Sequence, residues 1–272
     1  MYLGIVNIDH PVIASRDLDV TRAQFERLGF TVPPRGSHIE WGTGNLCIMF
    51  PGDYLEVRGI IDSERFTMHL DEHLDKHGEG LMGVAFGTGD VKASYAQAQE
   101  QGIQTGELRS LRRNFEHPEG WTQPAFELYA PDADDIEGLM HVVVIQHLTP
   151  ELIRRPDFLE HANGCLGISE MRGTIDNVDR VAAKMRKLLG EAAVEAGAQG
   201  IVLTVPSGQR IRLDKADKTG LLSMTMVVAN LDDTERLFID NDVAFVRDGK
   251  TITVSPNDAC GTTLHFSEAV SG

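Results

Sequence analysis

The chain has 272 residues, of which 25 are Lys or Arg and 41 are Asp or Glu, so its formal net charge at pH 7 is −16. This excess of negative charge repels phosphate backbones and anionic lipid surfaces, and neither nucleic acid nor a membrane is expected as a main partner. The length suggests about two domains at ~150 residues each, and a hydrophobic content of 42% is enough to form their cores.

The first part of the chain predicts one strand, one helix and then three short strands. Gly29 marks the end of the helix, because glycine reaches the left-handed conformation at no steric cost. Gly-Thr-Gly and Pro-Gly-Asp turns separate the later strands. The expected elements are a strand over residues 5–14, a helix over 16–28, and strands over 30–41, 45–50 and 54–61.

The same βαβββ order recurs three times. The second copy has a strand over 81–87, a helix over 90–102 and strands over 107–115, 122–129 and 139–147. The third has a strand over 166–172, a helix over 176–189 and strands over 200–206 and 210–213, with its last strand shortened or missing. The fourth has a strand over 222–229, a helix over 231–241 and strands over 243–248, 251–254 and 262–267.

Four such modules predict an α+β fold in which pairs of modules form open barrels, each with a cleft of ligand size. Modules one and two would form a domain over residues 1–148, and modules three and four a second domain over 164–272. The segment between them carries Thr149-Pro150, Arg155-Pro156 and Ala162-Asn163-Gly164, which are typical of turns.

Four sequence pieces, taken together, resemble the glyoxalase-like domain family of the vicinal oxygen chelate superfamily, which includes glyoxalases, extradiol dioxygenases and bleomycin-resistance proteins. The pieces are Ile8-Asp-His-Pro-Val-Ile-Ala, Gly36-x-His38-x-x-Trp41-Gly-Thr43-x-Asn45, Tyr54-Leu-Glu56 and His147-x-Thr-Pro-Glu-Leu. The resemblance implies paired βαβββ modules that form glyoxalase/bleomycin-resistance/dioxygenase-like barrels. It also implies a divalent metal on the concave face, held by residues of the first and last strands of modules.

His10 and Glu56 are the first two candidate metal ligands. Strand alternation puts His10 on one face with Val6, Ile8 and Val12, and Glu56 shares a face with Tyr54 and Arg58. A histidine and a carboxylate on neighbouring strands suit Fe²⁺, Mn²⁺, Ni²⁺ or Zn²⁺, and they match the superfamily's ligand positions. The alternative is that His10 is a hydrogen-bonded core histidine and Glu56 an ion partner of Arg58.

The third ligand is expected from the second module. Gly83 stands where a glyoxalase would place a histidine, while His141 and His147 share one face of the last strand. We expect His147 to be the ligand because it belongs to the recognisable family piece; the alternative is a strand-end residue that caps the following turn. With His10 and Glu56 it would form a two-histidine, one-carboxylate site with open positions.

His38, Trp41, Thr43 and Asn45 combine a flat apolar surface with imidazole and amide groups, a set that can orient an aromatic or carbonyl substrate. The alternative is a turn with Trp41 packed in the core. Arg112 and Arg113 point to opposite faces of a strand. We expect Arg113 to face the cleft as a clamp for a carboxylate or enolate oxygen, the alternative being a pair of surface charges.

The sequence gives weaker evidence of a functional role for the remaining histidine, glutamate and cysteine residues. His69, His73 and His77 share a helix-compatible face, but surrounding Asp, Glu and Lys residues favour a solvated helix over a metal patch. The first strands of modules three and four contain no histidine, and His265 and Glu268 have no evident partner. We therefore expect a structural or dimerising C-terminal half and a homodimer. The single cysteines Cys47, Cys165 and Cys260 predict buried reduced thiols.

No apolar run approaches the ~20 residues that a membrane-spanning helix needs, and the N-terminus lacks a basic segment, so a cytoplasmic protein is expected. The sequence predicts a metal-dependent glyoxalase-like enzyme for a small molecule with adjacent oxygens. It would be an isomerase, lyase or dioxygenase, with Glu56 or a nearby group handling a proton. The alternative is a non-catalytic binder of the bleomycin-resistance type; a dimeric scaffold with an empty cleft is a third possibility.

Overall fold

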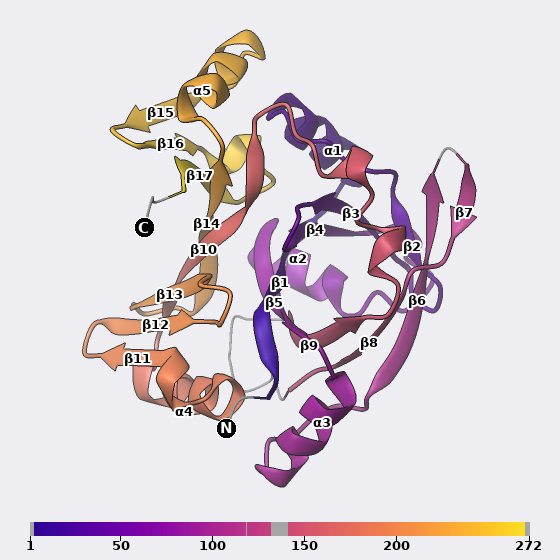
Figure 1. Ribbon diagram of the computed structural model, residues 1–272, viewed down its shortest axis with the longest axis vertical. Coiled ribbons are helices and arrows are strands. Elements are labelled where there is room, and N and C mark those ends of the chain that lie inside the picture. The colour runs from indigo at the N-terminus through magenta and orange to yellow at the C-terminus, as the bar shows by residue number, and fades with distance from the viewer. Residues whose placement is uncertain (1–2, 118, 132–140, 270–272) are drawn as a thin grey trace.

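The computed structural model describes residues 3–117, 119–131 and 141–269, in which two mixed sheets carry most of the structure (Figure 1). The α+β fold class and the four modules are confirmed. The N-terminal elements are β1(Ile5–Ser15), α1(Leu18–Arg27), β2(Gly36–His38), β3(Thr43–Met49), β4(Tyr54–Ile60), α2(Leu70–His77), β5(Gly80–Thr88), α3(Val91–Glu100), β6(Arg109–His117), β7(Gly120–Thr122), β8(Ala125–Tyr129) and β9(His141–His147). The expected start of β9, at residues 139 and 140, lies outside the described residues.

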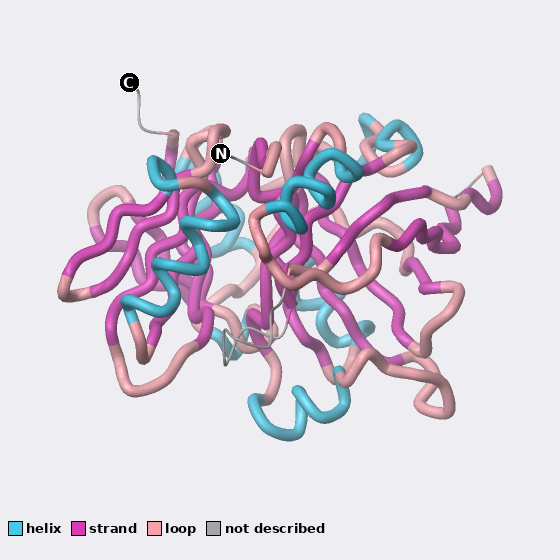
Figure 2. The backbone as a smooth tube through the Cα atoms, turned by 90° about the horizontal axis from the view of Figure 1, so that it is seen from below, coloured by secondary structure: helices cyan, strands magenta, loops and turns pink. Residues whose placement is uncertain are grey.

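Two short 3₁₀ turns, Pro150–Leu152 and Pro156–Phe158, connect the halves. The C-terminal elements are β10(Cys165–Ile175), α4(Val178–Leu189), β11(Val194–Gly197), β12(Gly200–Thr204), β13(Arg210–Lys215), β14(Gly220–Val228), α5(Leu231–Asp240), β15(Phe245–Asp248), β16(Thr251–Val254) and β17(Thr263–Glu268). Figure 2 shows the two strand-rich halves lying beside each other.

The N-terminal sheet closes into a barrel. Its strand order is β2-β3-β4-β1-β5-β9-β8-β6-β7, and β2 also pairs with β6 through Gly36, Ser37 and His38. This extra pairing joins the two modules at a second seam and encloses the space between them. The C-terminal sheet has the order β11-β12-β13-β10-β14-β17-β16-β15, with no corresponding closure among its described residues.

The two halves repeat each other down to their irregularities. β1 pairs with β4 in parallel and β5 antiparallel, and β10 pairs in the same way with β13 and β14. Both β1 and β10 have three register shifts at matching positions, one of them between Ile8 and His10 in β1 and between Ile168 and Glu170 in β10. His10 and Glu170 therefore occupy equivalent positions in the two halves.

Several details differ from the sequence-based expectation. The strand expected over residues 30–41 is confined to the three residues of β2. The third module is complete, and the expectation that its last strand is short or missing was wrong: β13 is present, and the strand absent from the expected set is β11, the first after the helix. Only the first residue of β11 is buried, so it lacks the alternation that identifies strands. The shift after Ile8 breaks the alternation of β1, so Ile8 packs in the main core whereas His10 faces the barrel interior.

One hydrophobic core spans both halves. Phe25 of α1, Met185 of α4 and Phe238 of α5 all belong to it, together with Phe86 of β5. A smaller cluster joins Leu70 and Leu74 of α2 to β1 and β5, so the predicted histidine-rich helix is present and packs on the barrel through its leucines. No helix in the described ranges has the length and apolar character needed to cross a membrane.

Gly83 shows why the second module lacks the histidine of its counterpart. A Cβ atom on Gly83 would lie 1.9 Å from the carbonyl oxygen of His141 on the neighbouring strand. We expect Gly83→Ala to lower the free energy of unfolding by about 1–3 kcal/mol or more, because the backbone of β9 cannot yield as a side chain would. The measurement is urea unfolding. Gly52→Ala is the control, since nothing lies within 4 Å of its added Cβ; equal midpoints for the two variants would contradict the prediction.

Candidate functional site

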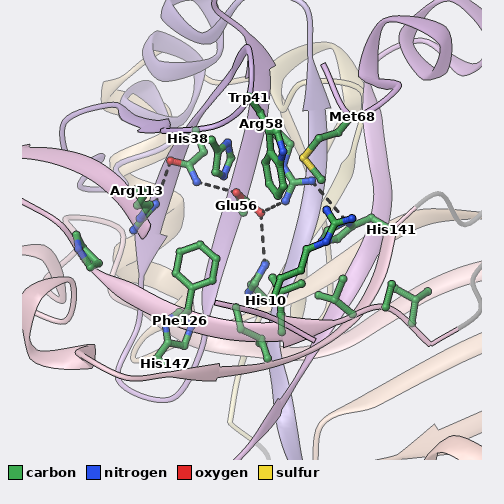
Figure 3. A pocket seen from close by; sticks show the side chains of 18 of the residues that line it. His10, His38, Trp41, Glu56, Arg58, Met68, Arg113, Phe126, His141 and His147 are labelled. Atoms are coloured by element: carbon green, nitrogen blue, oxygen red, sulfur yellow. Dashed lines mark hydrogen bonds and ion pairs between the residues drawn. The ribbon is translucent and has the colours of Figure 1, made fainter. Parts of the chain in front are cut away.

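A cavity of about 270 Å³ lies inside the N-terminal barrel (Figure 3). One side is polar and comes mainly from β1 and β4, which place His10, Tyr54, Glu56 and Arg58 in its wall. The opposite side is apolar and is supplied by β8 and β9. The apolar residues that line the cavity on this side include Phe126, Leu128, Ala130, Val143 and Ile145. A polar face opposite an apolar face is typical of sites for small organic molecules.

Asp9 and His10 form a buried pair at the β1 bulge. His10 Nδ1 donates to Asp9 Oδ1 at 2.7 Å, since an ionised carboxylate can only accept, and this contact directs Nε2 into the cavity. The same Asp9 oxygen accepts from His147 Nε2 at 3.0 Å. The Tyr54 ring stacks on His10 with centroids 4.2 Å apart. Asp9 thus connects the first strand of module one to the last strand of module two.

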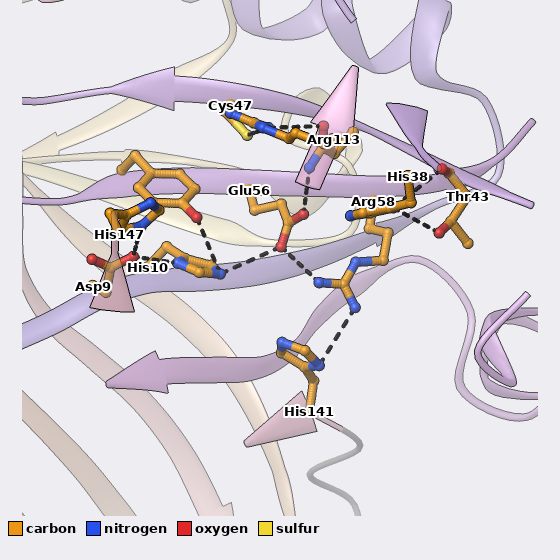
Figure 4. Close-up of polar contacts among 12 residues, drawn as sticks. Asp9, His10, His38, Thr43, Cys47, Glu56, Arg58, Arg113, His141 and His147 are labelled. Atoms are coloured by element: carbon orange, nitrogen blue, oxygen red, sulfur yellow. Dashed lines mark hydrogen bonds and ion pairs between the residues drawn. The ribbon is translucent and has the colours of Figure 1, made fainter. Parts of the chain in front are cut away.

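Glu56 is fully engaged on both oxygens (Figure 4). Oε1 accepts from Asn45 Nδ2 at 2.7 Å, and Oε2 accepts from the Arg58 guanidinium at 2.8 Å. His10 Nε2 lies 3.4 Å from Oε2. The result is a buried row of alternating charge, from Asp9 through His10 and Glu56 to Arg58, which we call the charge relay.

Burial and charge pairing shift the pKa values of Asp9, His10 and Glu56 in opposite directions. Burial by itself would raise the pKa of Asp9 and Glu56, but their cationic neighbours outweigh it and hold both pKa values below the usual range, chiefly through His147 and His10 for Asp9 and Arg58 for Glu56. Burial would lower the pKa of His10, but hydrogen bonds to Asp9 and Glu56 raise it overall. His10 is therefore held as an imidazolium between two carboxylates.

Arg113 is a second cation at this cavity. It is only 5% exposed, whereas Arg112 is exposed. Its Nη1 donates to Asn45 Oδ1 at 3.0 Å and to Cys47 Sγ at 2.8 Å. Burial raises the pKa of Cys47 to about 11, so this thiol is neutral. Across the described residues, no carboxylate forms an ion pair with Arg113 within 4.0 Å, which leaves its charge available to a ligand.

The Gly36 to Asn45 segment supplies one end of the cavity. His38 and Trp41 line it, with ring centroids 5.3 Å apart, and Thr43 is fully buried behind them. Thr43 Oγ1 lies 2.8 Å from His38 Nδ1, so it orients that ring without facing the cavity. Burial and then the charge of Arg58 lower the pKa of His38 to about 4, which makes it a neutral imidazole.

His141 also reaches the cavity, from β9. Its Nδ1 lies 3.4 Å from Arg58 Nη1, and burial followed by the Arg58 charge holds its pKa well below the usual range. Sequence reasoning considered His141 and preferred His147. It missed Asp9, because strict alternation in β1 puts Asp9 on the face opposite His10 and only the bulge brings both into one pair.

The donor atoms do not fit a three-ligand metal as arranged. His10 and Glu56 converge, but His147 is bonded to Asp9, and Arg58 places a positive charge on the Glu56 oxygen that a cation would need. Within the described ranges there is no group of three His, Cys, Asp or Glu side chains that could hold a metal ion. The Glu56–Arg58 ion pair weighed as an alternative from the sequence is present.

The glyoxalase-like domain family matches the chain over residues 8–189, which is more than half of its length. The chain therefore belongs to that family, and its fold is that of the vicinal oxygen chelate superfamily. No curated protein matches its sequence.

Solved structures share the fold at low sequence identity. A hypothetical protein from Staphylococcus aureus superposes with a TM-score of 0.76 at 14% identity, covering 97% of this chain and 100% of the other. A mutant 4-hydroxymandelate synthase from Streptomyces coelicolor gives 0.62 at 12% identity, with 99% and 95% covered. A xylose isomerase-like TIM barrel/4-hydroxyphenylpyruvate dioxygenase fusion protein gives 0.59 at 12% identity, with 98% and 49% covered. At these identities the likeness shows the fold alone.

The pKa shifts predict how stability depends on pH. The raised pKa of His10 gives a stabilisation that is complete below its ordinary value of 6.5 and is lost as pH rises through the raised value. The lowered pKa values of Asp9 and Glu56 give a stabilisation that is complete above their ordinary values of 3.8 and 4.5 and is lost as pH falls. The relay therefore contributes most between pH 4.5 and 6.5, as unfolding measured across pH should show.

The relay also predicts a direct change at His10. We expect Glu56→Gln to lower the pKa of His10 by about one unit or more, because one of two stabilising carboxylates is lost while burial remains. An NMR titration of the histidine ring measures this pKa. Glu170→Gln, which changes the residue of the other half that corresponds to His10, is the control and should leave the pKa of His10 unchanged. An unaltered His10 titration in Glu56→Gln would rule out the relay.

Proposed function

We propose that this chain is an enzyme that binds a small molecule with adjacent oxygen atoms in the N-terminal barrel and transfers a proton on it. The observation that carries the proposal is the buried charge relay facing a cavity with an apolar wall. Perturbed, buried acid and base groups that converge in one cavity are characteristic of catalytic sites.

The two central groups have complementary roles. Glu56 is held ionised and can accept a proton from a carbon next to a carbonyl, while the His10 imidazolium can donate one to the carbonyl oxygen. Their facing atoms lie 3.4 Å apart, so both reach the same two-carbon unit of a bound molecule. Glu56 then returns its proton to the neighbouring carbon while the neutral His10 recovers a proton from the hydroxyl on that carbon's partner oxygen, which completes an isomerisation and restores both groups. In a lyase reaction the β-substituent instead leaves with its bonding electron pair and the proton held by Glu56, and His10 recovers its proton from the enol oxygen.

The remaining cavity residues define the ligand. Arg113 and Arg58 favour an anionic oxygen, such as a carboxylate or enolate, and Phe126 with the β9 side chains favours an apolar or aromatic body. His38, Trp41 and Asn45 border the same space, with Thr43 supporting His38. The names of two structural neighbours refer to 4-hydroxymandelate and 4-hydroxyphenylpyruvate, which are carboxylates with an adjacent oxygen. These compounds are suitable first probes.

A metal would supply Lewis-acid polarisation of the same oxygens, and His10 with Glu56 and His147 would be its ligands. That form requires Arg58 to leave Glu56 and His147 to leave Asp9. The metal-dependent enzyme, whether isomerase, lyase or dioxygenase, is therefore an outcome of the test below. The non-catalytic binder is another, and homodimer formation through the C-terminal half stays a prediction.

The test of catalysis is exchange of carbon-bound hydrogen with D₂O, followed by NMR on the two probes. We expect exchange by the wild-type chain and a rate about 10²–10⁴ times lower for Glu56→Gln, because a positioned acid or base contributes that much. Glu170→Gln should retain the full rate.

Two results would change the assignment. Exchange lost on treatment with a chelator and restored by Fe²⁺, Mn²⁺, Ni²⁺ or Zn²⁺ would establish the metal-dependent form. Tight binding of the probes without exchange by the wild-type chain would establish the binder and reject the enzyme.

Arg113 gives a separate prediction on binding. We expect Arg113→Gln to weaken binding of 4-hydroxymandelate about tenfold or more, as expected for loss of a hydrogen bond to a charged group. Calorimetry with the acid and with its uncharged amide distinguishes charge recognition from shape, since only the acid should be affected. Arg112→Gln, one residue away and exposed, serves as the control; equal losses for both variants would contradict a clamp at Arg113.

A further inference from the structure

The turn before β4 and the turn before β13 meet between the two halves of the molecule. Asp53 directly precedes β4, and Gln209 directly precedes β13. Since β4 and β13 pair in parallel with β1 and β10 in matching registers, these two residues occupy equivalent positions. Gln209 Nε2 donates to Asp53 Oδ2 at 2.8 Å, so the repeated positions contact each other directly.

Each of the two side chains also bonds to the first strand of the opposite half. Gln209 Oε1 accepts from the backbone N–H of Ile8 at 2.9 Å. Asp53 Oδ2 accepts from the backbone N–H of Ile168 at 3.3 Å. Ile8 and Ile168 are themselves equivalent, each standing immediately before a bulge. We call this reciprocal set of contacts the interdomain latch.

The latch lies next to Asp9 and Tyr54, the two residues that hydrogen-bond to and stack on the His10 ring. Ile8 precedes the bulge residue Asp9, whose carboxylate accepts from His10 and His147. Asp53 precedes Tyr54, whose ring stacks on His10. Asp9 and Tyr54, which contact the His10 ring, are therefore each adjacent in the chain to a residue of the latch.

From this geometry we propose that Asp53 and Gln209 are positioning residues, which fix the β1 bulge from the C-terminal half and so hold Asp9 in place to polarise His10. The C-terminal half is then part of the functional unit. This role does not depend on which reaction the site performs, because it concerns the geometry of the Asp9–His10 pair.

Burial of the latch is consistent with this role. Asp53 is 6% exposed and Gln209 is 9% exposed. Burial raises the pKa of Asp53 to about 7, an effect that the nearby Asp9 carboxylate reinforces and that the Ile168 N–H and Arg154 oppose. Gln209 can donate to this oxygen whether or not Asp53 is ionised, so the contact survives around neutral pH.

The test compares Gln209→Ala with Asn163→Ala. Asn163 is 1% exposed and bonds to the carbonyl oxygen of Leu28 at 2.8 Å, so its loss weakens a contact between the halves without touching β1. Gln209→Ala is expected to fold, because the backbone bond from Ser207 to Val6 and the shared core remain. The readouts are the NMR titration of His10, the resonance of its Nδ1 proton, and the thermal midpoint of unfolding.

We expect both variants to lower the thermal midpoint, but only Gln209→Ala to lower the pKa of His10, by about one unit, and to broaden or remove the Nδ1 proton resonance. Asp53→Ala should reproduce the effect on His10 and replaces Gln209→Ala if that variant fails to fold. Asp53→Asn keeps an acceptor oxygen and should restore the wild-type titration. An unchanged His10 in Gln209→Ala or Asp53→Ala, or an equal change in Asn163→Ala, would overturn the proposal.

Discussion

The structure of the N-terminal half depends on one constraint, which is that the four buried charges of the relay must be paired with one another. Asp9, Glu56, Arg58 and His10 are each at most 5% exposed. An unpaired charge at such depth costs several kcal/mol, and the removal of one partner leaves the other uncompensated. The alternating order of the relay pairs the charge of every member, and it requires β1, β4 and β9 to keep their registers. Pairing of these charges therefore fixes the register of the strands that enclose the cavity.

The modular fold was predictable because its signal is repeated. Each first strand is followed by an N-capping Asp or Asn and an amphipathic helix, and the short strands are separated by glycine turns. The face of each β4 residue was also predictable, since Leu55 and Val57 enter the core while Glu56 and Arg58 line the cavity. Where a strand has no bulge, the alternation of its side chains was sufficient to predict which face of the sheet each residue occupies.

The site was less predictable because it depends on an irregularity. A bulge inserts one residue into β1, and nothing in the residue types at Ile8, Asp9 and His10 indicates where alternation breaks. The preference for His147 over His141 relied on a family motif, which does not reveal that Asp9 holds one ring and Arg58 contacts the other. β11 was missed for a related reason, as an edge strand with one buried residue carries no periodic signal.

The two halves carry different charged side chains at equivalent positions of their first strands. At the position of His10 the C-terminal half has Glu170, and Arg172 and Arg210 pair with its carboxylate at 2.6 and 3.1 Å. His265 and Glu268, which had no evident partner in the sequence, contact Thr253 and the first amide of α5. Only the closed N-terminal barrel leaves a buried cation, Arg113, without a carboxylate among the described residues. This local excess of positive charge can bind an anion although the whole chain carries −16, because distant surface charges are screened over about 8 Å at physiological salt.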